Sequence, residues 1–249
     1  MGIRSQLRSV KRQVVDRKIR KSEQRTYKEY KSRHFDLVAD LSTAHFETWS
    51  DTKHVNRPGF DAALSLMDGS PKTILETGTS AWGTDSTRLW DAYVAQFGGE
   101  FWTVDLSPNP SMRLQSQVSS RTHLEIGDSV EFIQNFVDST SCSHIDVCYL
   151  DSWDLDWSDP DPAAQHGLNE WNAVAPLMRQ GSILIIDDSP HSMQWVPSQY
   201  RALAQTYEQT HGYLPGKGAL VDLVLRADPR VEVIWHGYNS VYRFSGPIR

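Results

Sequence analysis

The sequence predicts an α/β fold: a seven-stranded, mostly parallel sheet with helices on both faces, ending in an antiparallel hairpin. From Lys72 onward, short apolar runs alternate with helical stretches, and strands separated by helices form right-handed βαβ units. The last two apolar runs are separated only by Gly237-Tyr238-Asn239, which is typical of a hairpin turn. A chain of 249 residues with 39% hydrophobic content is long enough for one such domain.

The elements follow from the periodicity of apolar residues. Upstream of the sheet, residues 34–70 predict a helical cap or lid, interrupted near Asn56-Arg57-Pro58-Gly59. Residues 71–249 predict the main domain. Its predicted strands are 73–76, 100–105, 123–126, 145–151, 182–187, 231–236 and 240–245, and its predicted helices are 85–97, 110–119, 129–138, 162–179 and 191–210.

The charge is distributed unevenly along the chain. Residues 1–33 contain twelve Lys or Arg and three acidic residues, which gives a charge of +9. Because the net charge of the whole chain is −6, the remaining residues carry −15. Residues 5–30 lack Gly and Pro and have few apolar positions, which predicts a protruding basic helical arm. The arm could contact nucleic acid, anionic lipid or a phosphorylated substrate. The alternative, which a charge run favours more often, is a solvated helix packed on the domain or on a second subunit of a homodimer.

Several protein classes are disfavoured. No stretch approaches 18 consecutive apolar residues, which excludes a membrane-spanning helix. The N-terminus lacks the apolar region of a secretory signal. Cys142 and Cys148 have no zinc-type spacing, so a reducing, cytoplasmic location is expected.

Glycines follow the first predicted strand. The segment 74–87 reads ILETGTSAWGTDST, with glycines at 78 and 83 and therefore no G-x-G-x-x-G. Gly78 allows a sharp turn and a close approach of the backbone to a ligand. The missing fingerprint and the terminal hairpin disfavour a nicotinamide-dependent oxidoreductase. A purely structural turn before a helix is the alternative.

Two acidic residues follow the next strands. Asp105 ends the second strand, 27 residues after Gly78, where a carboxylate can accept both hydroxyls of a ribose. Gly127-Asp128-Ser129 follows the third strand. Either acidic residue could instead be an ordinary helix cap.

Together these motifs resemble the class I S-adenosylmethionine (SAM)-dependent methyltransferases, whose motif I places Glu-x-Gly after the first strand. The resemblance covers roughly residues 70–245 and implies a Rossmann-like sheet that ends in a hairpin. Ser80 stands where a second glycine is common in that family. The residues expected at the cofactor are Glu76, Gly78, Thr79, Ser80, Gly83, Ser86, Asp105, Asp128, Ser129 and Asp151.

Carboxylates also end the fourth and fifth strands. Asp151 follows one, and Asp187-Asp188 follows the next. Because these strands would be neighbours, their carboxylates would meet and raise one another's pKa unless a cation joined them. The arrangement resembles metal-dependent O-methyltransferases of the macrocin or aminocoumarin sugar type and the catechol type. That resemblance implies that Asp151, Asp187 and Asp188 hold a divalent metal, with Mg²⁺ favoured; helix caps are the alternative.

Candidate bases lie after the fourth strand. His166 lies four residues before Glu170 on a predicted helix, so the two share a face. Asp154 is the other candidate catalytic base, and His191 could also face the site. Trp153, Trp157 and Trp195 could form the wall of an acceptor pocket or cover the sheet edge, and Lys217 between two glycines could meet an anionic acceptor or a carboxylate.

The predicted function is SAM-dependent O-methylation, assisted by a divalent metal, of a small hydroxylated acceptor, either a sugar or a phenol. The first alternative is a metal-independent methyltransferase that uses His166 or Asp154 as its base. Further alternatives are an NAD-dependent oxidoreductase and a non-catalytic nucleic-acid-binding protein that uses the basic arm.

Overall fold

Seven strands form a single sheet in the computed structural model, which describes residues 21–80, 83–140 and 142–247. Their order is β3-β2-β1-β4-β5-β7-β6. Strands β1 to β5 all run parallel to one another, whereas β7 runs antiparallel to both β5 and β6. The predicted parallel sheet with a terminal hairpin is therefore confirmed. The strands are β1 (Lys72–Thr77), β2 (Gly99–Asp105), β3 (Thr122–Ile126), β4 (Ile145–Leu150), β5 (Met178–Ile186), β6 (Val231–His236) and β7 (Ser240–Phe244).

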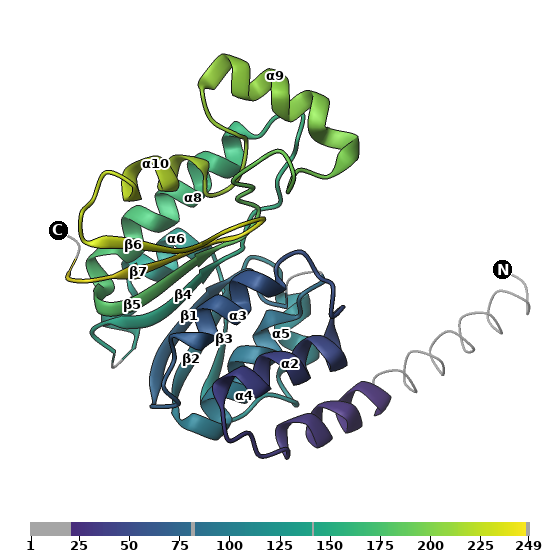
Figure 1. Ribbon diagram of the computed structural model, residues 1–249. Helices are drawn as coiled ribbons and strands as arrows, with labels where there is room; N and C mark the ends of the chain where they lie inside the picture. Colours follow the sequence, from purple (N-terminus) through teal and green to yellow (C-terminus); the bar gives the residue numbers. More distant parts are fainter. Residues whose placement is uncertain (1–20, 81–82, 141, 248–249) are drawn as a thin grey trace, which may run out of the picture.

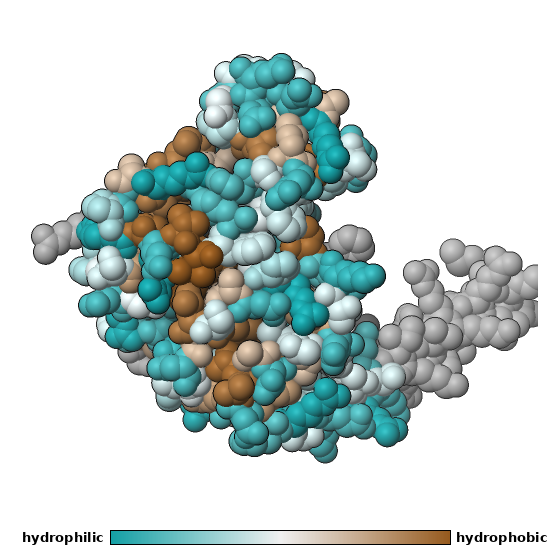
Figure 2. Space-filling model, in the orientation of Figure 1, coloured by the Kyte–Doolittle hydropathy of each residue, from teal (hydrophilic) through white to brown (hydrophobic). Residues whose placement is uncertain are grey.

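Helices cover both faces of the sheet (Figure 1). Helices α2, α3 and α4 pack on one face, and α6, α7, α8 and α10 pack on the other. Helix α9 stands out from the body as a separate lobe, and hydrophilic residues cover most of the lobe's visible surface (Figure 2). The helices are α2 (Val38–Trp49), α3 (Arg57–Ser65), α4 (Ser86–Phe97), α5 (Pro108–Leu114), α6 (Ser129–Gln134), α7 (Phe136–Ser139), α8 (Asp161–Val174), α9 (Arg201–His211) and α10 (Ala219–Leu225).

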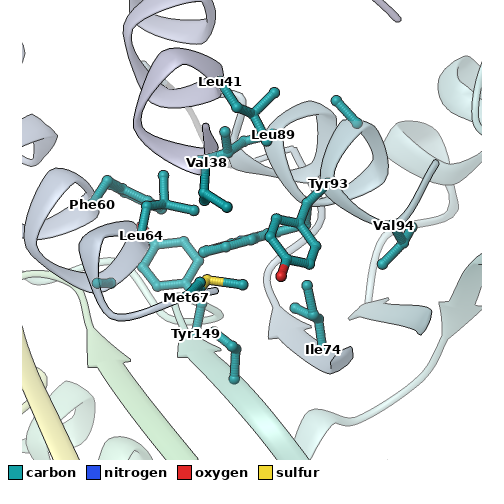
Figure 3. Packing of buried hydrophobic residues seen from close by; sticks show 14 of the residues in the cluster. Val38, Leu41, Phe60, Leu64, Met67, Ile74, Leu89, Tyr93, Val94 and Tyr149 are labelled. Atoms are coloured by element: carbon teal, nitrogen blue, oxygen red, sulfur yellow. The ribbon is translucent and has the colours of Figure 1, made fainter. Parts of the chain in front are cut away.

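Alternation along the strands builds two cores. On β4, Val147 and Tyr149 face the core beneath α2, α3 and α4, whereas Cys148 and Leu150 face the core beneath α8 and α10. This is the period of two that a strand buried on both faces requires. Figure 3 shows the first core, in which Phe60 and Leu64 of α3 lie close to Tyr149.

The N-terminal segments belong to the same core as the sheet. Residues 21–31 are helical, and Tyr27 and Tyr30 are buried with side chains of α2 and α4. The segment predicted as a cap contributes α2 and α3. Helix α3 packs against β5, β6 and β7, and α2 packs on α3 and α4. Residues 1–20 of the predicted basic arm lie outside the described residues.

Proline and glycine explain where the helices differ from the predictions. The helix predicted to reach residue 179 ends at Val174, because Pro176 has no N–H group and its ring obstructs a continuing helix. The helix predicted for 191–210 begins only at Arg201, since Pro197 disfavours a helical conformation at the residue before it. Helix α10 was not predicted. Among the described residues, no helix is both long and apolar enough to cross a membrane.

Candidate active site

The loop after β1 is anchored by a buried carboxylate. Glu76 is fully buried and accepts hydrogen bonds from the hydroxyls of Ser86 at 2.6 Å, Thr103 at 2.8 Å and Thr87. Burial raises the pKa of Glu76 to about 7, despite these three donors. Glu76 and Ser86, both expected at the cofactor, therefore lie beneath the loop and hold its shape, with their polar atoms bonded to each other.

The same loop approaches the end of β4. Gly78 has φ +85°, and a methyl group on it would lie 2.2 Å from the carbonyl oxygen of Asp151. Only glycine fits this position. Ser80 also adopts a left-handed conformation, with φ +56°, which agrees with its place where the family often has a second glycine. Gly83 packs against His54 of the α2–α3 connection.

A cavity opens at the carboxyl ends of β1, β2 and β3. The residues that line it include Gly78, Asp105, Asp128, Ser129 and His166. Asp105 accepts hydrogen bonds from the backbone N–H of Thr79 at 3.1 Å and of Ser107 at 2.7 Å. Four of the residues predicted to bind the cofactor thus meet at one cavity, at the edge where such sheets bind ligands.

His166 belongs to this cavity. Its Nε2 lies 2.9 Å from the Ser152 hydroxyl, 3.2 Å from that of Ser129 and 3.4 Å from Oε1 of Glu170. The hydrogen bond with buried Glu170 raises the pKa of His166, although its partial burial opposes the charge. Trp153 packs against the imidazole with ring centroids 5.0 Å apart. The predicted pair of His166 and Glu170 is therefore formed, and it borders the cavity.

Three carboxylates, which we call the carboxylate cluster (Asp151, Asp187 and Asp188), lie beyond the ends of β4 and β5. The Tyr149 hydroxyl joins two of them, at 2.9 Å from Oδ2 of Asp151 and 3.1 Å from Oδ2 of Asp187. Asn56 donates to Oδ1 of Asp187 at 2.7 Å. Burial raises the pKa of Asp151 to about 6 and that of Asp187 to about 7.

Asp188 occupies a strained position in the cluster. It has φ +45°, in the left-handed region that non-glycine residues adopt at a cost. The Tyr238 hydroxyl, from the β6–β7 turn, donates to its Oδ1 at 2.6 Å. Burial raises the pKa of Asp188.

A lysine lies among these carboxylates. Nζ of Lys217 is 2.8 Å from Oδ1 of Asp151, and the lysine side chain is 1% exposed. Burial opposes its charge, but Asp151, Asp188 and Asp187 together raise the pKa of Lys217. The expectation that Lys217 meets a carboxylate is met.

The remaining predicted site residues lie outside these two groups. Asp154 is exposed on the β4–α8 connection. His191 packs against His236 with ring centroids 4.0 Å apart and the rings tilted by 34°. Trp157 stacks on Tyr200, and Trp195 contacts Trp235 edge-on.

Three residues that contact the carboxylates were not singled out from the sequence. Tyr149 carried a usable signal, because it lies two positions before Asp151 and so points to the same side of the strand. Asn56 lies 131 residues from Asp187, and Tyr238 lies 50 residues from Asp188. No local pattern could have joined those pairs.

Comparison with known proteins gives structural neighbours only. No protein-family model and no curated protein matches the sequence. The chain is similar to MycE methyltransferase from the mycinamycin biosynthetic pathway, solved in complex with Mg, S-adenosylhomocysteine (SAH) and mycinamycin VI. The TM-score is 0.56 at 17% identity, covering 86% of this chain and 56% of MycE. A second MycE structure, with Mg and SAH, gives a TM-score of 0.53 at 16% identity, with the same coverage of both chains.

A putative O-methyltransferase from Klebsiella pneumoniae gives a TM-score of 0.48 at 15% identity and covers 86% of this chain and 92% of that one. Of MycE, by contrast, the chain spans little more than half the length. At these identities the likeness concerns the fold. The chain has the Rossmann-like fold of class I SAM-dependent methyltransferases, and the resemblance inferred from its motifs is confirmed.

Proposed function

We propose that this chain is a SAM-dependent methyltransferase that methylates a hydroxyl oxygen of a small acceptor, a sugar or a phenol. The observation that carries the proposal is the cavity in which Gly78, Asp105, Asp128 and Ser129 meet at the carboxyl ends of neighbouring strands. This edge is the ligand-binding edge of open α/β sheets. MycE, which shares the fold, was solved with SAH.

The cavity suggests a role for each residue along its wall. Asp105 would accept the ribose hydroxyls of SAM, since a carboxylate can accept two hydrogen bonds from neighbouring hydroxyls. The adenine would lie beside Asp128 and Ser129, near Trp153 and His166, which line the same cavity. The loop around Gly78 would then hold the amino-acid portion beside Asp151.

For this reaction the chain must orient the acceptor and remove the proton of its hydroxyl. SAM supplies an electrophilic methyl group on a sulfonium, and alignment of that methyl with the acceptor oxygen provides much of the acceleration. Of the two candidate bases, we favour Asp154, because its carboxylate is exposed three residues beyond Asp151. His166 is held by Glu170 and Ser152 at the cofactor cavity, where it would bind SAM and would not face the acceptor.

The carboxylate cluster as it stands does not fit a divalent ion. Mg²⁺ requires near-octahedral oxygen ligands at about 2.0–2.1 Å. Oδ1 of Asp151 faces the Lys217 ammonium, and the oxygens of Asp187 face Asn56 and Tyr149. Within the described ranges, no three His, Cys, Asp or Glu residues form a group that could hold a metal. The metal-independent route is therefore the one we propose, and the predicted Mg²⁺ site is not part of the proposal.

Calorimetric titration tests the proposed cofactor. We expect SAH to bind and NAD to give no heat. The D105A variant should bind SAH roughly 10- to 100-fold more weakly, because it loses hydrogen bonds to a charged acceptor worth about 1.5–3 kcal/mol. D138A, at an exposed aspartate on α7, serves as the matched control and should bind as the wild type does. Binding of NAD without binding of SAH would contradict the proposal.

A further inference from the structure

Lys217 is a buried cation that comes from a loop and not from a strand of the sheet. It lies in the connection between α9 and α10, yet its ammonium reaches the end of β4, 66 residues away in sequence. Its side chain is 1% exposed and its ion-pair partner Asp151 is 9% exposed. Lysine is almost never fully buried unless it is paired, so this pairing must offset a substantial loss of hydration.

The backbone around Lys217 is built to place it there. The Lys217 N–H donates to the carbonyl oxygen of Asp188 at 2.8 Å, and the Gly218 N–H donates to the Ser189 hydroxyl at 3.0 Å. A methyl group on Gly216 would lie 2.6 Å from that same Asp188 carbonyl, and one on Gly218 would lie 2.2 Å from the Ser189 hydroxyl. The segment therefore docks directly on the residues that follow β5.

Helix α8 closes the other side of this segment. A methyl group on Gly167 would lie 2.4 Å from the carbonyl oxygen of Lys217. Close backbone approaches of this kind need glycine on at least one side. The glycines at 167, 216 and 218 thus fix the lysine between α8 and the end of β5, so its ammonium has few alternative positions.

The negative charge of the cluster favours a cation bound among the three carboxylates. Three neighbouring carboxylates would repel one another in a buried site, and one positive charge among them relieves part of that repulsion. Asn56 donates to Oδ1 of Asp187 and Tyr238 donates to Oδ1 of Asp188, and the single Tyr149 hydroxyl lies between Oδ2 of Asp151 and Oδ2 of Asp187. These neutral donors and one ammonium together offset part of the cost of burying the carboxylates.

We propose that Lys217 is the permanent counter-cation of the carboxylate cluster and takes the place that a divalent metal would otherwise occupy. The ammonium repels a second cation and holds Asp151 in position beside the cofactor cavity. The inference deepens the proposed function. It rests on that function only for the role of the cluster in methyl transfer. In consequence, a protein side chain would remove the proton of the acceptor hydroxyl without help from a metal.

Manganese titration, followed by the electron paramagnetic resonance signal of free Mn²⁺, tests the proposal with SAH present. Wild-type protein should leave the free signal undiminished at stoichiometric concentrations. K217A should bind Mn²⁺ at least about thirtyfold more tightly, because a unit charge and a divalent ion of like sign about 4 Å apart repel even in a water-like dielectric. K72A is the matched control, since Lys72 also pairs with an aspartate, Asp68, but at the opposite end of β1; it should behave as the wild type does.

Thermal unfolding provides a second measurement. K217A should unfold at a lower temperature than the wild type, and Mn²⁺ at about a hundredfold excess over its Kd should raise that temperature by roughly 5–10 °C. Stoichiometric binding of one Mn²⁺ to the wild type would overturn the proposal, whether or not K217A folds. SAH calorimetry on the same samples separates this outcome from failure of the proposed function, because loss of SAH binding would contradict only the latter.

Discussion

Gly167 offers a sharp test of the packing around Lys217. It lies within α8, where replacing glycine by alanine ordinarily stabilises a helix by about 1 kcal/mol. Here the added methyl group would lie 2.4 Å from the Lys217 carbonyl oxygen and 3.3 Å from its Cγ, and overpacking of this kind costs about 1–3 kcal/mol. A contact this far inside van der Waals distance, against backbone, belongs at the upper end of that range. G167A should therefore lower the free energy of unfolding by about 2 kcal/mol.

Urea unfolding and thermal unfolding measure this change directly. For a chain of this size, about 2 kcal/mol corresponds to a fall of roughly 4–8 °C in Tm. N172A, at an exposed position on the same helix, is the control and should be neutral or slightly stabilising, because alanine is the better helix former. A G167A protein more stable than the wild type would refute the inferred contact between α8 and the Lys217 segment.

Two further predictions concern histidines. Burial lowers the pKa of His45 to about 4, whereas the unfolded chain takes up this proton near pH 6.5, so stability is fully present above pH 6.5 and falls as the pH drops toward 4. Between pH 7 and 5, His45 should account for a loss of about 2 kcal/mol in urea unfolding; an H45N variant with the same loss would assign the acid sensitivity to other groups. H166A should weaken SAH binding roughly two- to tenfold in calorimetry, whereas H191A should not; unchanged SAH affinity in H166A would return His166 to the role of acceptor base.

The fold could be predicted because its signals are local. Apolar runs alternating with helical stretches defined β1 to β5, and the Gly237-Tyr238-Asn239 turn defined the final hairpin. Where local signals conflicted, boundaries moved: the apolar and polar spacing across 191–210 favoured one long helix, and Pro197 limited it to the part from Arg201 onward. Helix α10 has only seven residues, too few for its periodicity to stand out beside the glycines that precede it.

The candidate site was predictable to the extent that strand ends determine it. Asp105, Asp128 and Ser129 follow successive strands, so the parallel topology alone brings them to one cavity. Glu76 was expected at the cofactor, but its surroundings depend on Thr103 of β2 and Ser86 of α4, which bury and bind its carboxylate. The lysine among the carboxylates depends on a docking of segments 66 residues apart, which no periodicity encodes.

The hydrogen bonds of Asn56 join the carboxylate cluster to the β6–β7 turn. Asn56 donates to Asp187, and its own carbonyl oxygen accepts a hydrogen bond at 3.0 Å from the side chain of Asn239, 183 residues away. Domains generally fold as units, and long-range contacts form slowly because a large loop must close first. The hydrogen bond from Asn239 cannot form before the β6–β7 turn has been synthesised, whereas Asp187 is synthesised earlier. The β6–β7 turn therefore helps to position Asn56 against the carboxylate cluster, so a chain that lacks the turn should lose this support for the contact between Asn56 and Asp187.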